Sequence, residues 1–394
     1  MPSSLKINPS RLQSDFNTLS AIGGIAQGGV NRPTFSAAHL EARAWFSEQV
    51  RRAGLELRMD GAGNHSAILR GANPSAPTLL LGSHLDSVPE GGRYDGALGV
   101  TAALEVLRTI QEAGLSLPVH LEAIDFTDEE GTLVGFIGSG ALAGSLSPEE
   151  LLNPRGGRQA LLDGLARAGL SESGLFTARR DPATLAGYLE LHIEQGPRLY
   201  DAGLDIGVVS GIVGIASYRL AFSGHANHAG TTPMHTRRDA GLGAAAFILA
   251  ARQLVLDSFP GCVANVGSLR LDPGAFNIVP GRAELALECR AVDPNILEQL
   301  QAVLLAAARQ AAESYGLGLD IAPLGVHEPA PMSPSVQQAI REAAGELGLS
   351  TQSMPSGAGH DAQNLARLCP SGMVFIPSVD GISHSPRETS RWED

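Results

Sequence analysis

The apolar and polar positions of the first half of the chain alternate between helical and strand patterns. Residues 40–55 repeat apolar positions at helical spacing and end beside a glycine, which predicts an amphipathic helix. Residues 78–89, 118–131 and 186–197 each start as a short apolar run and end in polar residues, as buried parallel strands do. A helical pattern at 101–114 separates the first two strands. This order predicts an α/β domain with a mostly parallel sheet flanked by helices.

The pattern changes between about residues 212 and 326. There the order is strand, helix, strand, strand, helix, strand, which is the ferredoxin-like arrangement. A helical pattern at 335–348 and an apolar strand at 371–378 then complete the first sheet. We therefore predict a catalytic domain in two pieces, residues 1–211 and 327–394, with a smaller α+β domain inserted at 212–326.

Composition narrows the function classes. The 394 residues are 43% hydrophobic and 18% charged, as in globular proteins. A formal net charge of −13 argues against nucleic acid or an anionic membrane as a partner. The three cysteines have no CxxC spacing, which favours a reducing compartment over a disulfide framework. No apolar core of a signal peptide and no run long enough to span a bilayer is evident, so we expect a cytoplasmic protein.

Five short segments place histidines or acids beside glycine or at the end of an apolar strand. Because open α/β sheets bind their ligands at the carboxyl ends of the strands, we expect these side chains to meet. Histidine and carboxylate together are ligands for Zn²⁺, Mn²⁺, Co²⁺ or Ni²⁺. The segments are GSHLDS (His84, Asp86), GRYDGA (Asp95), DFTDEEG (Glu129, Glu130), LHIEQG (His192, Glu194) and GISHSPRE (His384, Glu388).

Spacing suggests how these residues divide the work. His84 and Asp86 are two residues apart on a strand, so both side chains leave the same face, and Asp86 suits the carboxylate partner of a ligating histidine. His192 and Glu194 repeat this pattern. The adjacent acids Glu129 and Glu130 point in different directions, so one can bind metal while the other acts as general base. The blander alternative for the acidic run, considered alone, is a solvated turn.

Seven motifs in order, over nearly the whole chain, resemble those of the M20-type metallopeptidase superfamily. They are most similar to its hydantoinase/carbamoylase branch, which contains N-carbamoyl-L-amino-acid amidohydrolases, allantoate amidohydrolases and β-ureidopropionases. ELHIEQGP and HAGTTPM are specific to this branch, whereas HxD and EEG are shared with the wider superfamily. Tyr94 stands where the family often has phenylalanine. The motifs are GSHLDSVPEGGRYDGALGV, FTDEEG, ELHIEQGP, SGHANHAGTTPM, FNIVPGRAELALECR, SGAGHDAQ and GISHSPRE.

The resemblance implies a catalytic domain that holds two divalent metal ions. Asp95 would bridge the ions. The other ligands would be His84 and His192 for one ion and Glu130 and His384 for the other. Glu129 would be the general base, and Asp86 would orient His84. Zn²⁺ is the metal we expect first, with Mn²⁺, Co²⁺ and Ni²⁺ as alternatives.

The resemblance also implies that the inserted domain is a dimerisation (lid) domain. The position of His228 in the family reaches across a dimer interface and stabilises the oxyanion of the partner's substrate. Asn277 and Arg290 match positions that bind the substrate carboxylate. The remaining residues implied to line the site are Gln195, Gly357, Gly359 and His360, with Asp361 orienting His360.

The expected function is hydrolysis of the ureido C–N bond of N-carbamoyl-L-amino acids, giving the amino acid, ammonia and CO₂. The expected partners are a small carboxylated ureido substrate and a second copy of the chain. Allantoate, a ureidoglycine- or ureidopropionate-type compound, a dipeptide or an acylated amino acid are alternative substrates. A metal-free binding protein that kept the fold is the alternative outside the enzymes. Asp128 and His225 receive no role from the sequence.

Overall fold

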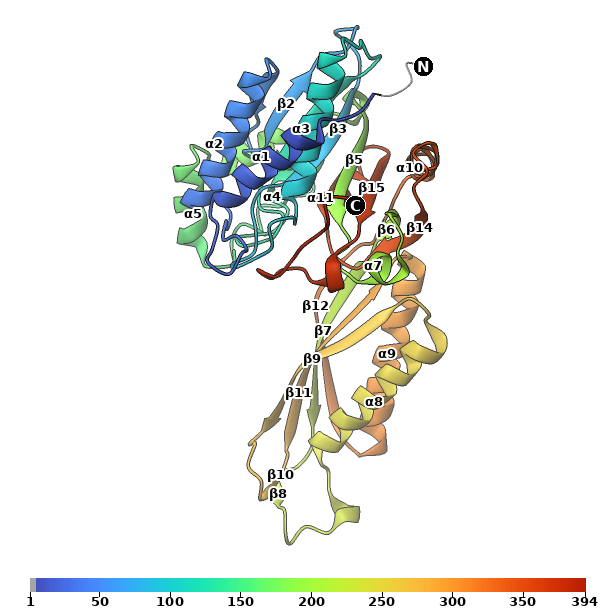
Figure 1. Ribbon diagram of the computed structural model, residues 1–394. Coiled ribbons are helices and arrows are strands. Elements are labelled where there is room, and N and C mark those ends of the chain that lie inside the picture. Colours follow the sequence, from blue (N-terminus) through green and yellow to red (C-terminus); the bar gives the residue numbers. More distant parts are fainter. Residues whose placement is uncertain (1–4) are drawn as a thin grey trace. The chain divides into compact units, whose positions relative to one another are not determined.

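The computed structural model describes residues 5–394, which form two compact units (Figure 1). Unit 1 comprises the chain up to Ser210 and from Met332 onward, and unit 2 comprises Gly211–Pro331.

The sheet of unit 1 has the strand order β1-β2-β4-β3-β5-β15-β6, and β14 also pairs with β6. Its central strands β4, β3, β5 and β15 run parallel, whereas β1, β2 and β6 pair antiparallel at the edges. The predicted mostly parallel sheet is confirmed. The strands are β1 (Glu56–Met59), β2 (His65–Leu69), β3 (Thr78–His84), β4 (His120–Phe126), β5 (Leu185–Ile193), β6 (Ile206–Ile212), β14 (Thr351–Ser356) and β15 (Ser371–Ile376).

Helices cover this sheet. The predicted helix at 40–55 is observed as α2, which starts after the capping side chain of Ser36 and buries Ala42, Phe46 and Val50 at helical spacing. α1, α2 and α3 share one hydrophobic cluster with β3 and β4. The helices are α1 (Pro9–Ala21), α2 (Ala37–Arg52), α3 (Ala97–Glu112), α4 (Ile137–Ala143), α5 (Arg158–Arg167), α6 (Glu172–Leu175), α7 (Arg198–Ala202), α10 (Pro334–Glu346) and α11 (Asp361–Leu365), with 3₁₀ turns at Phe176–Ala178, Pro182–Thr184 and Val379–Gly381.

The parallel strands end where the predicted chemistry begins. β3 ends at His84, β4 ends at Phe126 just before the acidic run, and β5 ends at Ile193 beside His192. β15 ends at Ile376, ahead of the segment that carries His384. Because these strands are parallel neighbours, their carboxyl ends bring four of the five segments to one edge of the sheet.

Unit 2 has a four-stranded sheet of order β12-β7-β11-β9, with every pair antiparallel. α8 and α9 cover one face, against alternate residues of β11 such as Leu285 and Leu287. The chain order is βαββαβ, as predicted, with a small β8–β10 pair added. The elements are β7 (Gly214–Ser223), β8 (Asn227–His228), a 3₁₀ turn (Met234–Thr236), α8 (Ala240–Ser258), β9 (Val263–Asp272), β10 (Ile278–Val279), β11 (Arg282–Ala291), α9 (Pro294–Ser314), β12 (Gly318–His327) and β13 (Ala330–Pro331).

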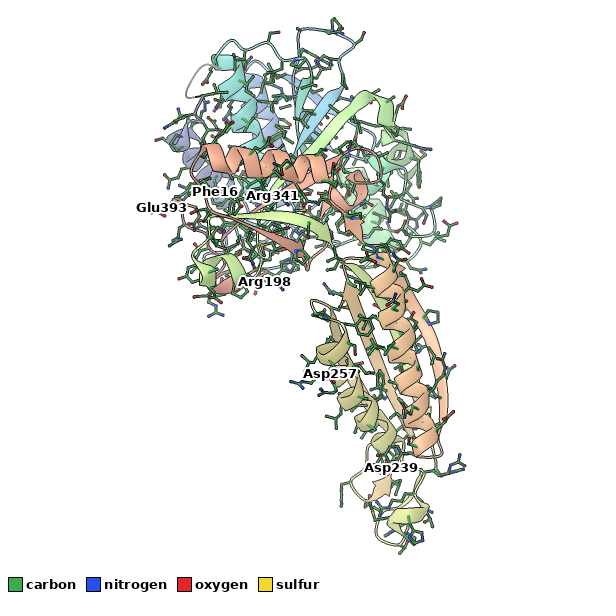
Figure 2. All side chains as sticks on the ribbon, turned by 90° about the vertical axis from the view of Figure 1, so that its right-hand side faces the viewer. Phe16, Arg198, Asp239, Asp257, Arg341 and Glu393 are labelled. Carbon is green, nitrogen blue, oxygen red and sulfur yellow. The ribbon has the colours of Figure 1, made fainter. Side chains whose placement is uncertain are left out.

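α8 has one buried and one exposed apolar face. Asp239 caps its first turn and Asp257 lies near its other end (Figure 2). Contrary to the expectation from the sequence, this helix is long and apolar enough to cross a membrane by length and composition alone, a test that core helices of soluble proteins also pass. Phe247 faces the sheet cluster, whereas Leu249 and Leu256 are 71% and 60% exposed. An exposed apolar stripe of this kind is typical of a surface that another molecule covers.

The half-buried histidine His65 makes the stability of unit 1 depend on pH. Burial, assisted by the charge of Arg43, lowers the pKa of His65 to about 3 from an ordinary value of 6.5. The unfolded chain therefore binds a proton that the folded chain excludes, so the contribution of His65 is complete above pH 6.5 and is lost as the pH falls toward 3.

We predict that the His65→Gln variant, measured by denaturant unfolding of chelator-treated protein, has a shallower decline in the free energy of unfolding below pH 6.5. The difference in slope should reach at most about 1.4 kcal/mol per pH unit. Parallel pH profiles for the two proteins would contradict the assignment.

Candidate metal centre

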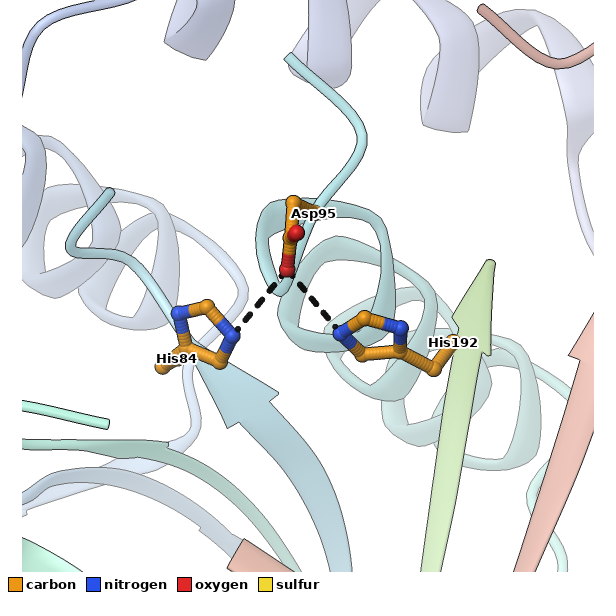
Figure 3. A group of neighbouring side chains, drawn as sticks. All are labelled: His84, Asp95 and His192. Atoms are coloured by element: carbon orange, nitrogen blue, oxygen red, sulfur yellow. Dashed lines mark ion pairs between the residues drawn. The ribbon is translucent and has the colours of Figure 1, made fainter. Parts of the chain in front are cut away.

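Three buried side chains from separate segments meet at the carboxyl edge of the sheet (Figure 3). One oxygen of Asp95, Oδ1, lies 3.4 Å from Nε2 of His84 and 3.1 Å from Nε2 of His192. Asp95 lies in the loop before α3, His84 ends β3 and His192 lies near the end of β5. The Nε2 atom of His84 is buried and makes no hydrogen bond among the described residues. These are three predicted metal ligands, and the structure brings them together.

A second triad uses the other oxygen of Asp95. Nε2 of His384 lies 3.4 Å from Asp95 Oδ2 and 3.4 Å from Glu130 Oε2. The side chain of Glu130 is buried, whereas the side chain of His384 is 51% exposed, so solvent reaches the site beside His384. Asp95 is therefore shared between two triads and faces each with a different oxygen.

The distances fit ligands that surround cations. Two ligand atoms that each lie about 2.1 Å from one ion, about 100° apart, are separated by about 3.2 Å. The nitrogen–oxygen separations of 3.1–3.4 Å in both triads match this value. Histidine nitrogen with carboxylate oxygen is the donor chemistry of Zn²⁺, Mn²⁺, Co²⁺ or Ni²⁺. The arrangement is consistent with a binuclear site for divalent ions.

The electrostatics of the site also favour bound cations, because several buried acids lie close together there. Burial raises the pKa of Glu129 well above its ordinary range, and Asp361 and Glu130 raise it further against the opposing effect of His84. Burial and then Asp95 raise the pKa of Glu130 to about 8. Burial also acts against ionisation of Asp95, but His192 and His384 hold its pKa well below the ordinary range. Cations among these groups would favour the charged carboxylates and leave the histidines neutral for binding.

The glycine at position 96 lets the backbone lie close to His84 and His192. Gly96 has φ +64°, and a Cβ atom there would lie 2.4 Å from the ring of His84. The N–H of Gly96 also points to Nε2 of His192 at 3.3 Å. A side chain at position 96 would therefore collide with the ring of His84 and be strained by the positive φ.

Asp86 supports the site differently from the sequence prediction. The ring Nδ1 of His84 bonds to the backbone carbonyl of Asp86 at 3.0 Å, while the Asp86 carboxylate lies 3.7 Å away. The carboxylate instead accepts the N–H groups of Glu129 and Glu130, both at 3.3 Å. Asp86 thus orients His84 through its main chain and the two glutamates through its side chain.

The expected parallel between the pairs 84/86 and 192/194 is wrong. Nδ1 of His192 bonds to the carbonyl of Ile193, at 2.9 Å. Glu194 turns away and accepts the N–H groups of Arg198 and Leu199 at the start of α7. It serves as a helix cap because its carboxylate satisfies the free donors of a helix N-terminus.

Gln195, predicted to line the site, does lie there. Its backbone has φ +59°, and its amide Nε2 donates to Asp95 Oδ2 at 2.8 Å. The N–H of Gln195 is held by Ser378 Oγ at 3.0 Å. The side chain therefore projects to the shared carboxylate.

Asp128, which the sequence left without a role, organises the acidic loop. It is fully buried with φ +58°. Its carboxylate accepts the N–H groups of Leu133, Val134 and Gly135 at 3.1, 2.7 and 2.8 Å. The loop after β4 thus folds around this side chain, and Glu129 and Glu130 leave it toward the ligands.

Two further buried acids hold the ligand-bearing segments. Glu190 accepts the hydroxyls of Ser83 and Tyr188 at 2.8 and 2.9 Å, so it links β3 to β5 beside both histidines. Sequence reasoning missed it, although an acid inside an apolar strand, two residues before His192, is a usable signal. Glu388 accepts the N–H groups of Tyr94 and Asp95 at 2.9 and 3.1 Å, so it fixes the backbone of the shared ligand.

His360, which the sequence predicts to line the substrate site, is buried in the structure. It is 1% exposed, its ring is 4.5 Å from that of His192, and its Nε2 contacts Ser356 Oγ at 2.8 Å. Asp361 is buried beside it, but no hydrogen bond joins the two side chains among the described contacts. Gly357 and Gly359 lie in the same loop, between β14 and α11. His360 thus packs against a predicted metal ligand, and its contact with substrate stays a prediction.

The predicted site residues of unit 2 fall into two separate groups. His228 on β8 and Asn277 lie side by side, because β8 pairs with β10 and the N–H of Ala229 donates to the carbonyl of Asn277 at 3.0 Å. Arg290 lies near the other end of β11 and pairs with Glu288 at 2.7 Å. The eight residue steps from Arg282 to Arg290 alone span about 26 Å. One carboxylate therefore cannot bind Asn277 and Arg290 of the same chain, and the prediction that both residues bind the substrate carboxylate requires them to come from different subunits.

A parallel sheet that ends in two ligand triads is an arrangement used by two-metal hydrolases. Comparison with known proteins gives the family. The chain belongs to the peptidase family M20/M25/M40, whose sequence model matches residues 80–394.

Individual similar proteins indicate which branch of this family the chain resembles most. The chain is 39% identical over 390 residues to the N-carbamoyl-L-amino acid amidohydrolase of Geobacillus stearothermophilus, covering 98% of this chain and 95% of the relative. It is 34% identical to the allantoate amidohydrolase of Bacillus subtilis (strain 168), covering 94% and 90%. A hydantoinase/carbamoylase family amidase from Burkholderia multivorans superimposes with a TM-score of 0.90 at 34% identity, covering 99% and 94%. The resemblance stated from the motifs is confirmed.

The sharing of Asp95 predicts how metal content responds to mutation. Asp95→Ala removes a ligand from both triads, so we expect it to lose both ions, whereas His384→Ala should retain the ion of the buried triad. Metal content after dialysis, measured by mass spectrometry, tests this. His327→Ala, which removes an exposed histidine on β12, is the matched control. Full occupancy in the Asp95→Ala protein would refute the shared-ligand arrangement.

Proposed function

We propose that the protein is a binuclear metal-dependent amidohydrolase that cleaves the ureido C–N bond of N-carbamoyl-L-amino acids. The observation that carries the proposal is the pair of ligand triads around Asp95 with a glutamate beside them that belongs to neither triad. This glutamate is Glu129, whose Oε2 lies 3.5 Å from Nε2 of His84. The similarity to N-carbamoyl-L-amino acid amidohydrolases over nearly the whole chain supports the substrate class. In this proposal the ligands are His84, Asp95, Glu130, His192 and His384, the ions are Zn²⁺ first and Mn²⁺, Co²⁺ or Ni²⁺ otherwise, and the protein is cytoplasmic.

The bound ions would act as Lewis acids and lower the pKa of the attacking water. Glu129 then takes a proton from that water as it attacks the carbamoyl carbon. When the C–N bond breaks, Glu129 returns the proton to the amino-acid nitrogen. The carbamate that leaves decomposes to ammonia and CO₂. Because Asp86 holds the N–H groups of both Glu129 and Glu130, the base keeps a fixed position relative to a ligand.

His228 is prepared to donate a hydrogen bond. Its Nδ1 accepts the N–H groups of Gly230 and Thr231 at 3.0 and 3.3 Å. Nδ1 therefore carries no hydrogen, and in the neutral ring the hydrogen is on Nε2. The residue is exposed on β8. We assign it to the partner subunit's active site, where this N–H stabilises the negative charge that develops on the carbamoyl oxygen.

Arg290 and Asn277 have different parts in this proposal. Arg290 lies on the face of β11 opposite the helices and offers a planar guanidinium to the substrate carboxylate. Asn277 is adjacent to His228 and therefore acts with it, on substrate bound by the partner subunit. Gln195, Gly357 and Gly359 line the site in unit 1.

The apolar stripe of unit 2 supports a homodimer. Leu242, Leu249 and Leu256 are exposed along α8, and Val263 and Leu269 are exposed on the neighbouring edge strand β9. An edge strand beside an apolar helix face suits an isologous interface with a second copy of the chain. Unit 2 is then the dimerisation domain, residues 212–326 by the sequence prediction.

Allantoate is the second candidate substrate, favoured by the similarity to the allantoate amidohydrolase. A substrate panel separates the candidates: N-carbamoyl-L-amino acids, allantoate, ureidopropionate, an acylated amino acid and a dipeptide, each with Zn²⁺, Mn²⁺, Co²⁺ and Ni²⁺. Ammonia release with the highest kcat/KM for the N-carbamoyl compounds supports the proposal. Turnover of the dipeptide alone, without ammonia, would refute it.

Glu129→Gln should keep the metal and lose turnover. Glutamine preserves size but cannot accept the proton, so we expect kcat to fall by about 10²–10⁴-fold. Metal content should stay at the wild-type level, because Glu129 is outside both triads. Glu149→Gln, in an exposed turn, is the control. A kcat within a few-fold of wild type would remove Glu129 as the base.

Mixing two inactive variants tests catalysis across the dimer. A His228→Ala subunit keeps its own Glu129, and a Glu129→Gln subunit can lend its His228, so their heterodimer has one complete site. Activity should therefore recover on mixing to up to about a quarter of the wild-type value for random pairing of subunits. Absence of recovery after demonstrated subunit exchange would place His228 outside the partner's site.

A further inference from the structure

Residues 30–34 contact two loops that carry predicted metal ligands, the loop between His84 and Asp95 and the acidic loop after β4. Residues 30–34 precede residue 80, where the match begins. The N–H of Val30 donates to the carbonyl of Gly91 at 3.0 Å. Arg32 donates its N–H to Ser87 Oγ at 2.9 Å and accepts the N–H of Ser87 at 3.0 Å. Residues 30–34 thus run along the loop between His84 and Asp95.

The side chain of Arg32 donates hydrogen bonds to backbone carbonyl oxygens. It is 1% exposed, and among the described residues it makes no ion pair. Its Nε donates to the carbonyl of Leu85 at 3.1 Å, and its Nη1 donates to the carbonyl of Leu19 at 2.8 Å. Burial lowers the pKa of Arg32 to about 10, so the guanidinium stays charged at neutral pH. A buried cation is thereby used to hold the residue that directly follows His84.

Thr34 joins this segment to the acidic loop. Its hydroxyl lies 2.9 Å from Asp86 Oδ2 and 2.7 Å from Asp128 Oδ1, and its N–H donates to Thr132 Oγ1 at 3.0 Å. Thr34, Asp86 and Asp128 are all buried. The hydroxyl, which donates its one hydrogen to one carboxylate at a time, therefore lies between the carboxylate that holds Glu129 and Glu130 and the carboxylate around which their loop folds.

Nothing else in unit 1 joins these two carboxylates among the described hydrogen bonds. Without the hydroxyl, Asp86 and Asp128 would be two buried acids facing each other with no donor between them. Their repulsion would displace the start of the acidic loop, and with it the base and a ligand.

We propose that residues 30–34 form a positioning element for the metal centre, and that the Thr34 hydroxyl is its decisive contact. Thr34 acts through Asp86 and Asp128 on Glu129 and Glu130, and it touches neither substrate nor metal. The proposal rests on the proposed function only in requiring that the two triads hold divalent ions.

The matched variants are Thr34→Val, which removes the hydroxyl at nearly constant size, and Thr34→Ser, which keeps it. Thr109→Val is the control, because Thr109 is also buried and also lies within hydrogen-bond distance of a carboxylate, that of Glu105 at 3.3 Å, on α3. Metal affinity is measured by competition with a chelator, and the Co²⁺-loaded proteins are compared by visible absorption. kcat and KM are then measured on the metal-saturated, folded fraction.

For Thr34→Val we expect metal affinity or kcat to fall by about 10- to 100-fold, as for loss of groups that orient metal ligands. The Co²⁺ spectrum should change and KM should change much less than kcat, because the substrate contacts remain. Thr34→Ser should restore all three quantities toward wild type, and Thr109→Val should leave them unchanged. If Thr34→Val does not fold, Thr34→Ala replaces it in the comparison.

Equal metal affinity, Co²⁺ spectrum and kcat for Thr34→Val and Thr109→Val would overturn the proposal, even if both lose stability. The metal measurements need no substrate. If the wild-type protein hydrolyses none of the ureido compounds but Thr34→Val still binds metal more weakly, the positioning role stands and the proposed activity fails.

Discussion

The shared carboxylate of Asp95 is the contact on which the architecture of unit 1 depends. Its two oxygens face four other side chains, His84, His192, Glu130 and His384, which come from four separate segments. The parallel strands deliver these segments to one edge, and Glu388 fixes the backbone N–H of Asp95 itself. A shift of that loop would alter both triads together, since one residue serves both.

Around this centre, buried acids are held by hydrogen-bond donors, mostly backbone N–H and hydroxyl groups. Asp86, Asp128, Glu190 and Glu388 together accept donors from the loops and strands that carry the ligands. Burying a carboxylate is costly unless such donors satisfy it, so each of these contacts also fixes the loop that supplies the donor. The loops that carry the ligands are therefore held in place by hydrogen bonds within the protein.

Much of the arrangement could be predicted from the sequence, and the exceptions have physical reasons. Strand ends, the spacing of His84 and Asp86 and the βαββαβ order are local patterns, so they appear in the sequence directly. Glu194 has the same spacing to His192, yet it caps α7, because that helix starts four residues on, at Arg198, and its free N–H groups bind the carboxylate. The separation of Asn277 from Arg290 depends on the length of β11 between them, which motif matching does not register. Thr34 and Asp128 interact across 94 residues, and no local pattern links them.

The central claim is that two ions, bound through Asp95, are required for cleavage of a ureido bond. The most direct test titrates the chelator-treated protein with Zn²⁺ or Co²⁺ while ammonia release from an N-carbamoyl-L-amino acid is followed. The account predicts that activity is absent without metal and reaches its plateau at about two equivalents of ion per chain. Full activity in the metal-free protein would contradict it.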